Sequence, residues 1–179
     1  MVPDARRTTG NLNLGSGRDY LTGWVNLDVT PDTNPDVVHD LNVVPWPFES
    51  DRFARVKMFD VLEHLDRPLD SLIELHRVCA PGARVEIVVP HFSSGNAYTD
   101  ITHRTFFGYF SLDTVTGEHT HDYYTQIRYR MVRRTIEFYK TPVGKIALRL
   151  ANRYPAGYEQ RWAWIFPAWF VVFELEVHK

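Results

Sequence analysis

One stretch near the start of the chain, residues 11–28 (NLNLGSGRDYLTGWVNLD), limits the possible folds more than any other. Leucines alternate with asparagines over residues 11–14, which predicts a short strand that runs into Gly15-Ser16-Gly17. A second predicted strand, residues 24–27, ends on Asp28. Glycines after a strand let the backbone approach a ligand where a Cβ would collide. An acid at the end of the next strand can accept hydrogen bonds from both hydroxyls of a ribose. The stretch therefore predicts a nucleoside-binding edge.

Further along the chain, several strands end on chemically active residues. The predicted strands are a short apolar pair at residues 37–38 before Asp40, residues 55–59 before Asp60, and residues 84–90 before His91. Strands that alternate with a helix favour a doubly wound α/β sheet, whose ligands lie beyond the carboxyl ends of its strands. The convergence of these strand ends supports the site predicted from the glycine turn.

One helix is predicted clearly between those strands. Leucines and isoleucine recur at helical spacing after residue 65, with Asp66 as a cap and Pro68 in the first turn. Pro81-Gly82 is expected to end this helix.

The second half of the chain is less regular. Residues 91–121 are rich in loops, residues 127–139 alternate as a strand, Thr141-Pro142 begins a helix, and residues 169–177 form the last strand. The aromatic residues near the end are expected to pack in the core, with an acceptor pocket or a dimer surface as the alternative; they are Trp162, Trp164, Phe166, Trp169 and Phe170.

Size and composition set broad limits. A chain of 179 residues suits a single domain, and a net charge of −2 argues against a nucleic-acid or membrane partner. The single cysteine, Cys79, excludes an intrachain disulfide and fits a reducing, cytoplasmic compartment. The first ten residues hold no apolar run, so no signal peptide is expected.

Six pieces of the chain, taken in order, resemble the class I S-adenosylmethionine-dependent methyltransferases, in particular small members with a methyltransferase type 11-like core. These pieces are LNLGSG, the Asp of VNLD, the acid of HDL, PWPFESDRFARV, DVLEHL and RVCAPGARVEIVVPH. They cover residues 11–91, about half the chain. The resemblance implies a Rossmann-like sheet, mostly parallel with an antiparallel last strand. It also implies one domain, 1–179, with a cofactor-binding half (11–91), an acceptor-side insertion (92–167) and a final strand (168–179).

The resemblance also implies the cofactor, S-adenosyl-L-methionine, and its contacts. In the family the glycine loop passes the methionine part, an acid after strand two holds the ribose, and an acid after strand three reaches the adenine. The same resemblance implies that Asp60 lies where the family's strand four meets the cofactor and the acceptor. The implied cofactor-binding residues are Asn13, Gly15, Ser16, Gly17, Asp28, Asp40, Leu41 and Asp60.

The chain departs from the family in four places. Asn13 stands where an acid is usual, and Arg18-Asp19 replace a second glycine pair. The family's usual N-terminal helices are also missing. Residues 18–24 leave little chain for a parallel crossover, which normally needs roughly a dozen residues or more. We therefore expect one helical turn to make the crossing, or residues 142–153 or a second subunit to cover that face of the sheet.

Together these features predict a methyltransferase that acts on an O or N atom of a small-molecule acceptor. They are compatible with a homodimer. The alternatives are a cofactor-binding interaction protein without catalysis, or methylation of a macromolecule. A nicotinamide cofactor is less suitable, because Tyr20 occupies the third glycine position of its motif and Asp28 arrives too early.

Two histidines are candidates for a catalytic base. His91 ends a strand beside the one that carries Asp60, and His103 lies in the loop that follows. Histidine titrates near neutral pH, as a base for a hydroxyl acceptor requires. We predict that both border the acceptor pocket and that His103 is the base; the alternative is that both only bond loop backbone. His64 is expected in the wall of the site.

Two further clusters of ionisable residues invite a functional interpretation. His119 and His121, within EHTHD, have the spacing of metal ligands on a strand, but no third ligand is evident, so no metal site is predicted. The arginines of residues 128–134 are expected to form a solvated strand face, with an anionic acceptor or partner as the alternative.

Overall fold

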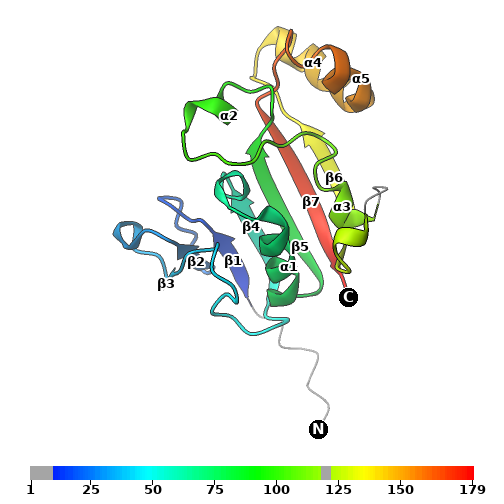
Figure 1. Ribbon diagram of the computed structural model, residues 1–179. Coiled ribbons are helices and arrows are strands. Elements are labelled where there is room, and N and C mark those ends of the chain that lie inside the picture. Colours follow the sequence, from blue (N-terminus) through cyan, green and yellow to red (C-terminus); the bar gives the residue numbers. More distant parts are fainter. Residues whose placement is uncertain (1–9, 118–121) are drawn as a thin grey trace.

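The computed structural model describes residues 10–117 and 122–179 and is organised around one seven-stranded sheet (Figure 1). The strand order is β3-β2-β1-β4-β5-β7-β6, in which β7 is antiparallel to both of its neighbours and the other pairs are parallel. The strands are β1 Asn11–Leu14, β2 Val25–Asp28, β3 Val37–Val38, β4 Phe53–Phe59, β5 Cys79–Pro90, β6 Arg128–Ile136 and β7 Phe170–His178. The predicted sheet, mostly parallel with an antiparallel last strand, is confirmed.

Short helices connect the strands. They are η1 Pro31–Thr33, η2 Leu62–His64, α1 Pro68–Val78, α2 Asn96–Thr99, α3 Asp113–Thr116, η3 Asp122–Tyr124, α4 Pro142–Arg153 and α5 Pro155–Arg161. Two details of α1 were predicted wrongly. Its N-cap position is Arg67, without a side-chain capping bond, instead of Asp66. The chain enters β5 directly at Cys79, so Pro81-Gly82 lie inside that strand, where Gly82 takes a positive φ of 77°.

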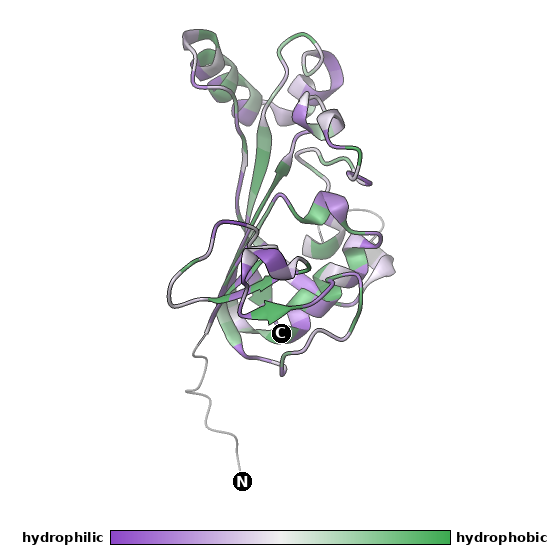
Figure 2. Cartoon of the chain, turned by 90° about the vertical axis from the view of Figure 1, so that its left-hand side faces the viewer, coloured by the Kyte–Doolittle hydropathy of each residue, from purple (hydrophilic) through white to green (hydrophobic). Residues whose placement is uncertain are grey.

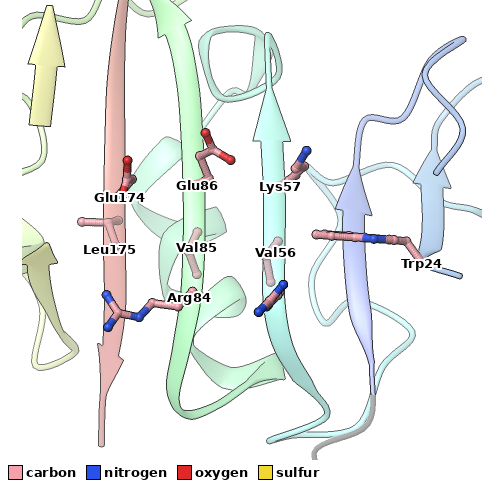
Figure 3. A pocket seen from close by; sticks show the side chains of 9 residues that line it. Trp24, Val56, Lys57, Arg84, Val85, Glu86, Glu174 and Leu175 are labelled. Carbon is pink, nitrogen blue, oxygen red and sulfur yellow. The ribbon is translucent and has the colours of Figure 1, made fainter. Parts of the chain in front are cut away.

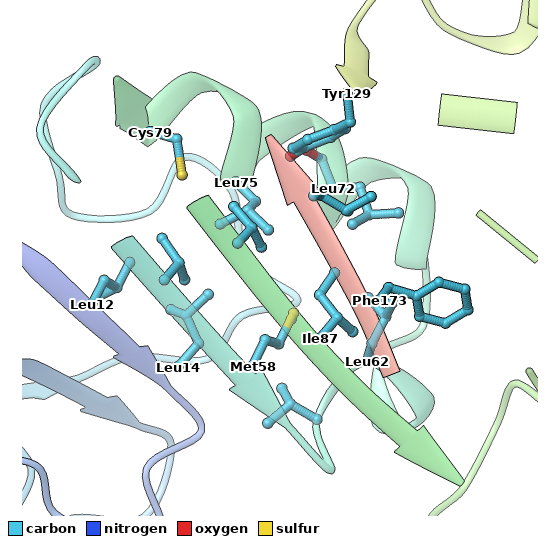
Figure 4. Close-up of a cluster of buried hydrophobic side chains, with 14 of the residues drawn as sticks. Leu12, Leu14, Met58, Leu62, Leu72, Leu75, Cys79, Ile87, Tyr129 and Phe173 are labelled. Carbon is cyan, nitrogen blue, oxygen red and sulfur yellow. The ribbon is translucent and has the colours of Figure 1, made fainter. Parts of the chain in front are cut away.

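The main core lies between the sheet and α1 (Figure 4). Alternate residues of the central strands point to this side, and Leu12, Leu14 and Ile87 have no exposed surface. Cys79 is buried as well, and its burial raises the pKa of the thiol to about 12. The side chain is therefore a packing group.

The opposite face of the sheet is not covered by a helix in the described part of the chain (Figure 2). It carries charged side chains such as Arg84 and Glu86, and the Trp24 ring lies across β1 with the Lys57 ammonium 5.7 Å from its centre (Figure 3). The expectation that residues 142–153 cover this face is wrong, because α4 packs against α5 and β6. This face thus carries charged side chains where a covering helix was expected, and cover by a second subunit stays a prediction.

The short crossover between β1 and β2 is held by polar contacts instead of a helical turn. Asn26, with no exposed surface, donates hydrogen bonds from its amide to the Leu21 carbonyl and to Asp36, each at 3.0 Å. Its amide oxygen accepts from the Leu21 N–H and from the amide of Asn13. Buried polar groups paired in this way let a loop lie against the strand without a helix.

The helices α4 and α5 form a separate unit at one end of the sheet (Figure 2). Thr141 caps α4 by accepting from the Gly144 N–H, as predicted. The aromatic residues that follow were expected in the core, but Trp162, Trp164 and Phe166 are 46–66% exposed. Trp162 and Phe166 line an apolar groove of about 780 Å³. This surface suits the dimer surface that was the alternative interpretation of these residues, and a homodimer stays a prediction. Among the described residues, no helix is both long and apolar enough to cross a membrane.

Candidate functional site

A cavity of about 350 Å³ opens at the carboxyl ends of β1, β2 and β4. Six of the eight predicted cofactor-binding residues line it together, although they come from four separate segments of the chain. The lining residues are Gly15, Gly17, Leu27, Asp28, Val29, His39, Asp40, Leu41, Asn42, Asp60, Val61, His64 and Leu65. The meeting of strand ends predicted from the sequence is therefore present in the structure.

The glycine turn has the geometry that requires glycine. Gly15 has a φ of 61°, and a Cβ built on it would lie 2.2 Å from the Cγ2 of Val61. Gly17 has a φ of 48°, with no atom within 4 Å of its notional Cβ. The first glycine therefore allows the close packing of the turn on the β4 end, and the second leaves open space at the cavity.

Asp28 holds the turn and the strand end together. One carboxylate oxygen accepts from the Gly17 N–H at 2.7 Å, and the other accepts from the Thr30 N–H at 2.8 Å. A carboxylate has about four acceptor positions, so each oxygen can accept one more hydrogen bond. Asp28 is 8% exposed and lies at the cavity wall, so its carboxylate can accept hydrogen bonds from two hydroxyl groups there.

The outer wall of the cavity is formed by the segment after β3. Asp40 is exposed and accepts from the backbone and the side-chain amide of Asn42, which forms a tight turn. Leu41 is buried, and its carbonyl accepts from the indole N–H of Trp46. The turn is thus anchored to the core while the Asp40 carboxylate faces the opening.

Two predicted contacts lie outside the cavity lining. Asn13 uses its amide to bond Asn26 and the Asp19 carbonyl, so it supports the loop from beneath. Ser16 is 4% exposed, and its hydroxyl has no hydrogen-bond partner in the described structure. A direct role of these two residues in cofactor binding stays a prediction.

The end of the cavity next to β4 carries ionisable groups. Asp60 has a positive φ of 53°, and burial raises the pKa of its carboxyl. His64 lines the cavity, and burial lowers the pKa of its imidazole. Its ring packs edge-on against the ring of His103 with centres 4.6 Å apart. The loop after β5 thus places His103 beside His64, but His103 itself does not line the cavity, and its position at the acceptor pocket stays a prediction.

Glu63 is a site residue that sequence reasoning missed. It is 1% exposed, and neither carboxylate oxygen has a hydrogen-bond partner among the described residues. Burial raises the pKa of this carboxyl to about 8. The Nε2 of His103 lies 4.0 Å from one oxygen. The signal in the sequence was a charged residue between the apolar positions of DVLEHL, which resembled a helix start.

His91 is placed differently from His103. Its ring is fully buried, with Nδ1 2.8 Å from the Ser93 hydroxyl and Nε2 3.1 Å from the Glu159 carboxylate on α5. It does not line the cavity. With both ring nitrogens engaged, His91 joins the β5 end to α5, and this geometry does not favour a role as a base.

The structure describes one of the two other clusters of ionisable residues. His119 and His121 lie outside the described residues. Arg130 and Arg133 are exposed and pair with glutamates of β7, as a solvated strand face predicts. Arg134 differs, because its side chain is 6% exposed and pairs with Asp113 at 2.7 Å.

Comparisons with known proteins identify the fold. No protein-family model matches the chain, and no curated protein matches it. Among solved structures, a SAM-dependent methyltransferase from Archaeoglobus fulgidus superposes with a TM-score of 0.55 at 16% identity, covering 95% of this chain and 88% of that one. A SAM-dependent methyltransferase from Aquifex aeolicus gives 0.54 at 13% identity, with 97% and 85% covered. The [4+2]-cyclase SpnF gives 0.61 at 12% identity, with 95% and 75% covered. The chain therefore has the class I methyltransferase fold, which also occurs in a cyclase.

Proposed function

We propose that this chain is an S-adenosylmethionine-dependent methyltransferase that transfers a methyl group to an O or N atom of a small-molecule acceptor. The observation that carries the proposal is the cavity at the strand ends, where the glycine turn, Asp28 and Asp40 converge. In α/β sheets of this kind, ligands bind at this edge. The SAM-dependent methyltransferases that share the fold support the same cofactor.

The residues present fit that cofactor. The volume of about 350 Å³ lies in the range of small-ligand sites. Gly15 takes a conformation in which any Cβ would overlap Val61, so the backbone itself forms this part of the wall. In the proposal, Asp28 accepts from the ribose hydroxyls, and Asp40 with Leu41 borders the adenine.

When bound, S-adenosylmethionine supplies a methyl group that its sulfonium makes electrophilic. The protein then has to align a nucleophile with that group and exclude water. Asp60 and His64 border the end of the cavity next to β4. The loop after β5 closes against this end, since the N–H groups of Arg104 and Thr105 donate to the Glu63 carbonyl. We assign the acceptor to this side.

The first test is cofactor binding. S-adenosylhomocysteine should raise the melting temperature of the protein by mass action, whereas NAD should not. Equal stabilisation by NAD, or none by S-adenosylhomocysteine at millimolar concentration, would exclude the proposed cofactor.

The second test is methyl transfer to a panel of small hydroxyl and amine acceptors. Transfer to any member supports the enzyme. Cofactor binding without transfer to small acceptors would favour the interaction protein or a macromolecular acceptor instead.

A further inference from the structure

We propose that Glu63, His64 and His103 form a binding site for a divalent transition-metal ion at the acceptor end of the cavity. One potential ligand atom from each residue lies within 4.8 Å of the other two. Two imidazoles and one carboxylate on one side of an ion are a common ligand set for metals such as zinc and iron, and they leave further positions open. His64 lines the cavity, so these open positions face the proposed acceptor.

The hydrogen bonds around His64 fix its protonation in the form that a metal needs. Thr102 donates its single hydroxyl hydrogen to the Asp100 carboxylate at 2.7 Å. The same hydroxyl lies 2.8 Å from the Nδ1 of His64, so it must accept there, and Nδ1 must carry the hydrogen. The lone pair of His64 is therefore on Nε2.

His103 is oriented in the same way. Its Nδ1 lies 3.1 Å from the Ala97 carbonyl, which can only accept, so Nδ1 is the donor. Nε2 is then left with its lone pair and faces Glu63 at 4.0 Å. Metal-bound histidines typically donate their other ring nitrogen to a carbonyl or to another acceptor, as both of these do.

Glu63 is the independent observation that points to a ligand. A carboxylate that is 1% exposed and has no hydrogen-bond partner in the described part of the chain lacks the compensation that buried polar groups normally have. Ligand atoms around a metal at 2.0–2.2 Å lie roughly 3.3–3.6 Å apart. On metal binding, the distance between Glu63 Oε1 and His103 Nε2 would shorten by less than about 1 Å, a change that rotation of the side chains can supply.

The metal site and the general base predicted for His103 exclude each other, because the same Nε2 cannot serve both. Metal binding itself does not depend on the proposed function. The further step, that the ion orients an oxygen or nitrogen of the acceptor, rests on that function.

The experiment uses Co²⁺, whose visible absorption reports its coordination, after removal of metals with EDTA. We expect saturable binding of one Co²⁺ per chain and its displacement by Zn²⁺. His64→Ala and His103→Ala should each weaken binding at least 100-fold, whereas a His119→Ala/His121→Ala double variant should bind like the parent. His64→Cys should retain Co²⁺ and add a thiolate charge-transfer band in the near ultraviolet, which a purely structural role of His64 would not produce.

Circular dichroism and S-adenosylhomocysteine binding by the metal-free protein separate this test from that of the proposed function. Loss of Co²⁺ binding in the His119→Ala/His121→Ala variant, with retention in His64→Ala and His103→Ala, would overturn the assignment. Absence of saturable binding by the folded parent chain would overturn it as well.

Discussion

The backbone N–H of Gly17 donates to the carboxylate of Asp28 at 2.7 Å, which joins the glycine turn after β1 to the end of β2. The hydrogen bond places an acid and an open backbone on one wall of the cavity. Under the proposed function, Asp28 has two tasks, to hold the turn and to receive the ribose.

We expect Asp28→Ala to weaken S-adenosylhomocysteine binding by about 1.5–3 kcal/mol, roughly 10- to 160-fold, because hydrogen bonds to a charged group are lost. Isothermal titration calorimetry measures the change, and Asp32→Ala, an exposed acid on η1, is the matched control. Unchanged affinity in a folded Asp28→Ala variant would refute the ribose assignment.

Gly15→Ala should destabilise the protein more than Gly23→Ala. Both glycines have positive φ, so both substitutions carry a backbone cost of about 1–2 kcal/mol. Only at Gly15 would the new methyl meet Val61, which adds about 1–3 kcal/mol. Urea denaturation compares the two variants.

Adding Val61→Ala to Gly15→Ala should recover part of the loss, because the two residues are in contact. Equal destabilisation by Gly15→Ala and Gly23→Ala would contradict the role given to the close packing.

Asn26→Leu should lower the free energy of unfolding by at least about 2 kcal/mol, because it leaves several buried polar partners without a hydrogen bond. The partners include the Leu21 N–H and carbonyl. Thr22→Ala, an exposed change in the same loop, should have little effect. If both variants unfold at the same urea concentration, the polar contacts do not hold the crossover.

The ionised Glu74 carboxylate is expected to stabilise the fold by an amount that depends on pH. Burial raises its pKa, but hydrogen bonds from Arg77 and from the Trp46 N–H outweigh this effect and leave the pKa below its ordinary value of 4.5. A carboxyl with a depressed folded pKa stabilises the fold above its unfolded pKa, and this stabilisation is lost as the pH falls through the folded pKa.

Glu74→Gln should therefore cost about 1–3 kcal/mol at pH 7, and the difference from the parent should shrink below pH 4.5. Denaturation at pH 7 and pH 4 measures it, with Glu49→Gln, an exposed change on the neighbouring loop, as the control. A difference that grows at pH 4 would contradict this account.

The strands and the residues at their ends could be predicted from the sequence because both depend on local pattern. Alternating leucines mark β1, β-branched residues mark β5, and the order of parallel strands brings their carboxyl ends to one edge. For this reason the sequence pattern predicts that Gly15, Asp28 and Asp60 share one site, and all three line the same cavity.

The remaining features depend on contacts between distant segments, which local pattern does not encode. Glu63 becomes a site residue only because the loop after β5 folds back and its backbone N–H groups donate to the Glu63 carbonyl. This contact places the His103 ring beside the Glu63 carboxylate. The Nε2 of His91 contacts the carboxylate of Glu159, a residue of α5, and so the ring does not face the cavity. Whether an ionisable side chain faces a ligand or a partner in the core is decided by which segment packs on it, and only the tertiary structure contains that information.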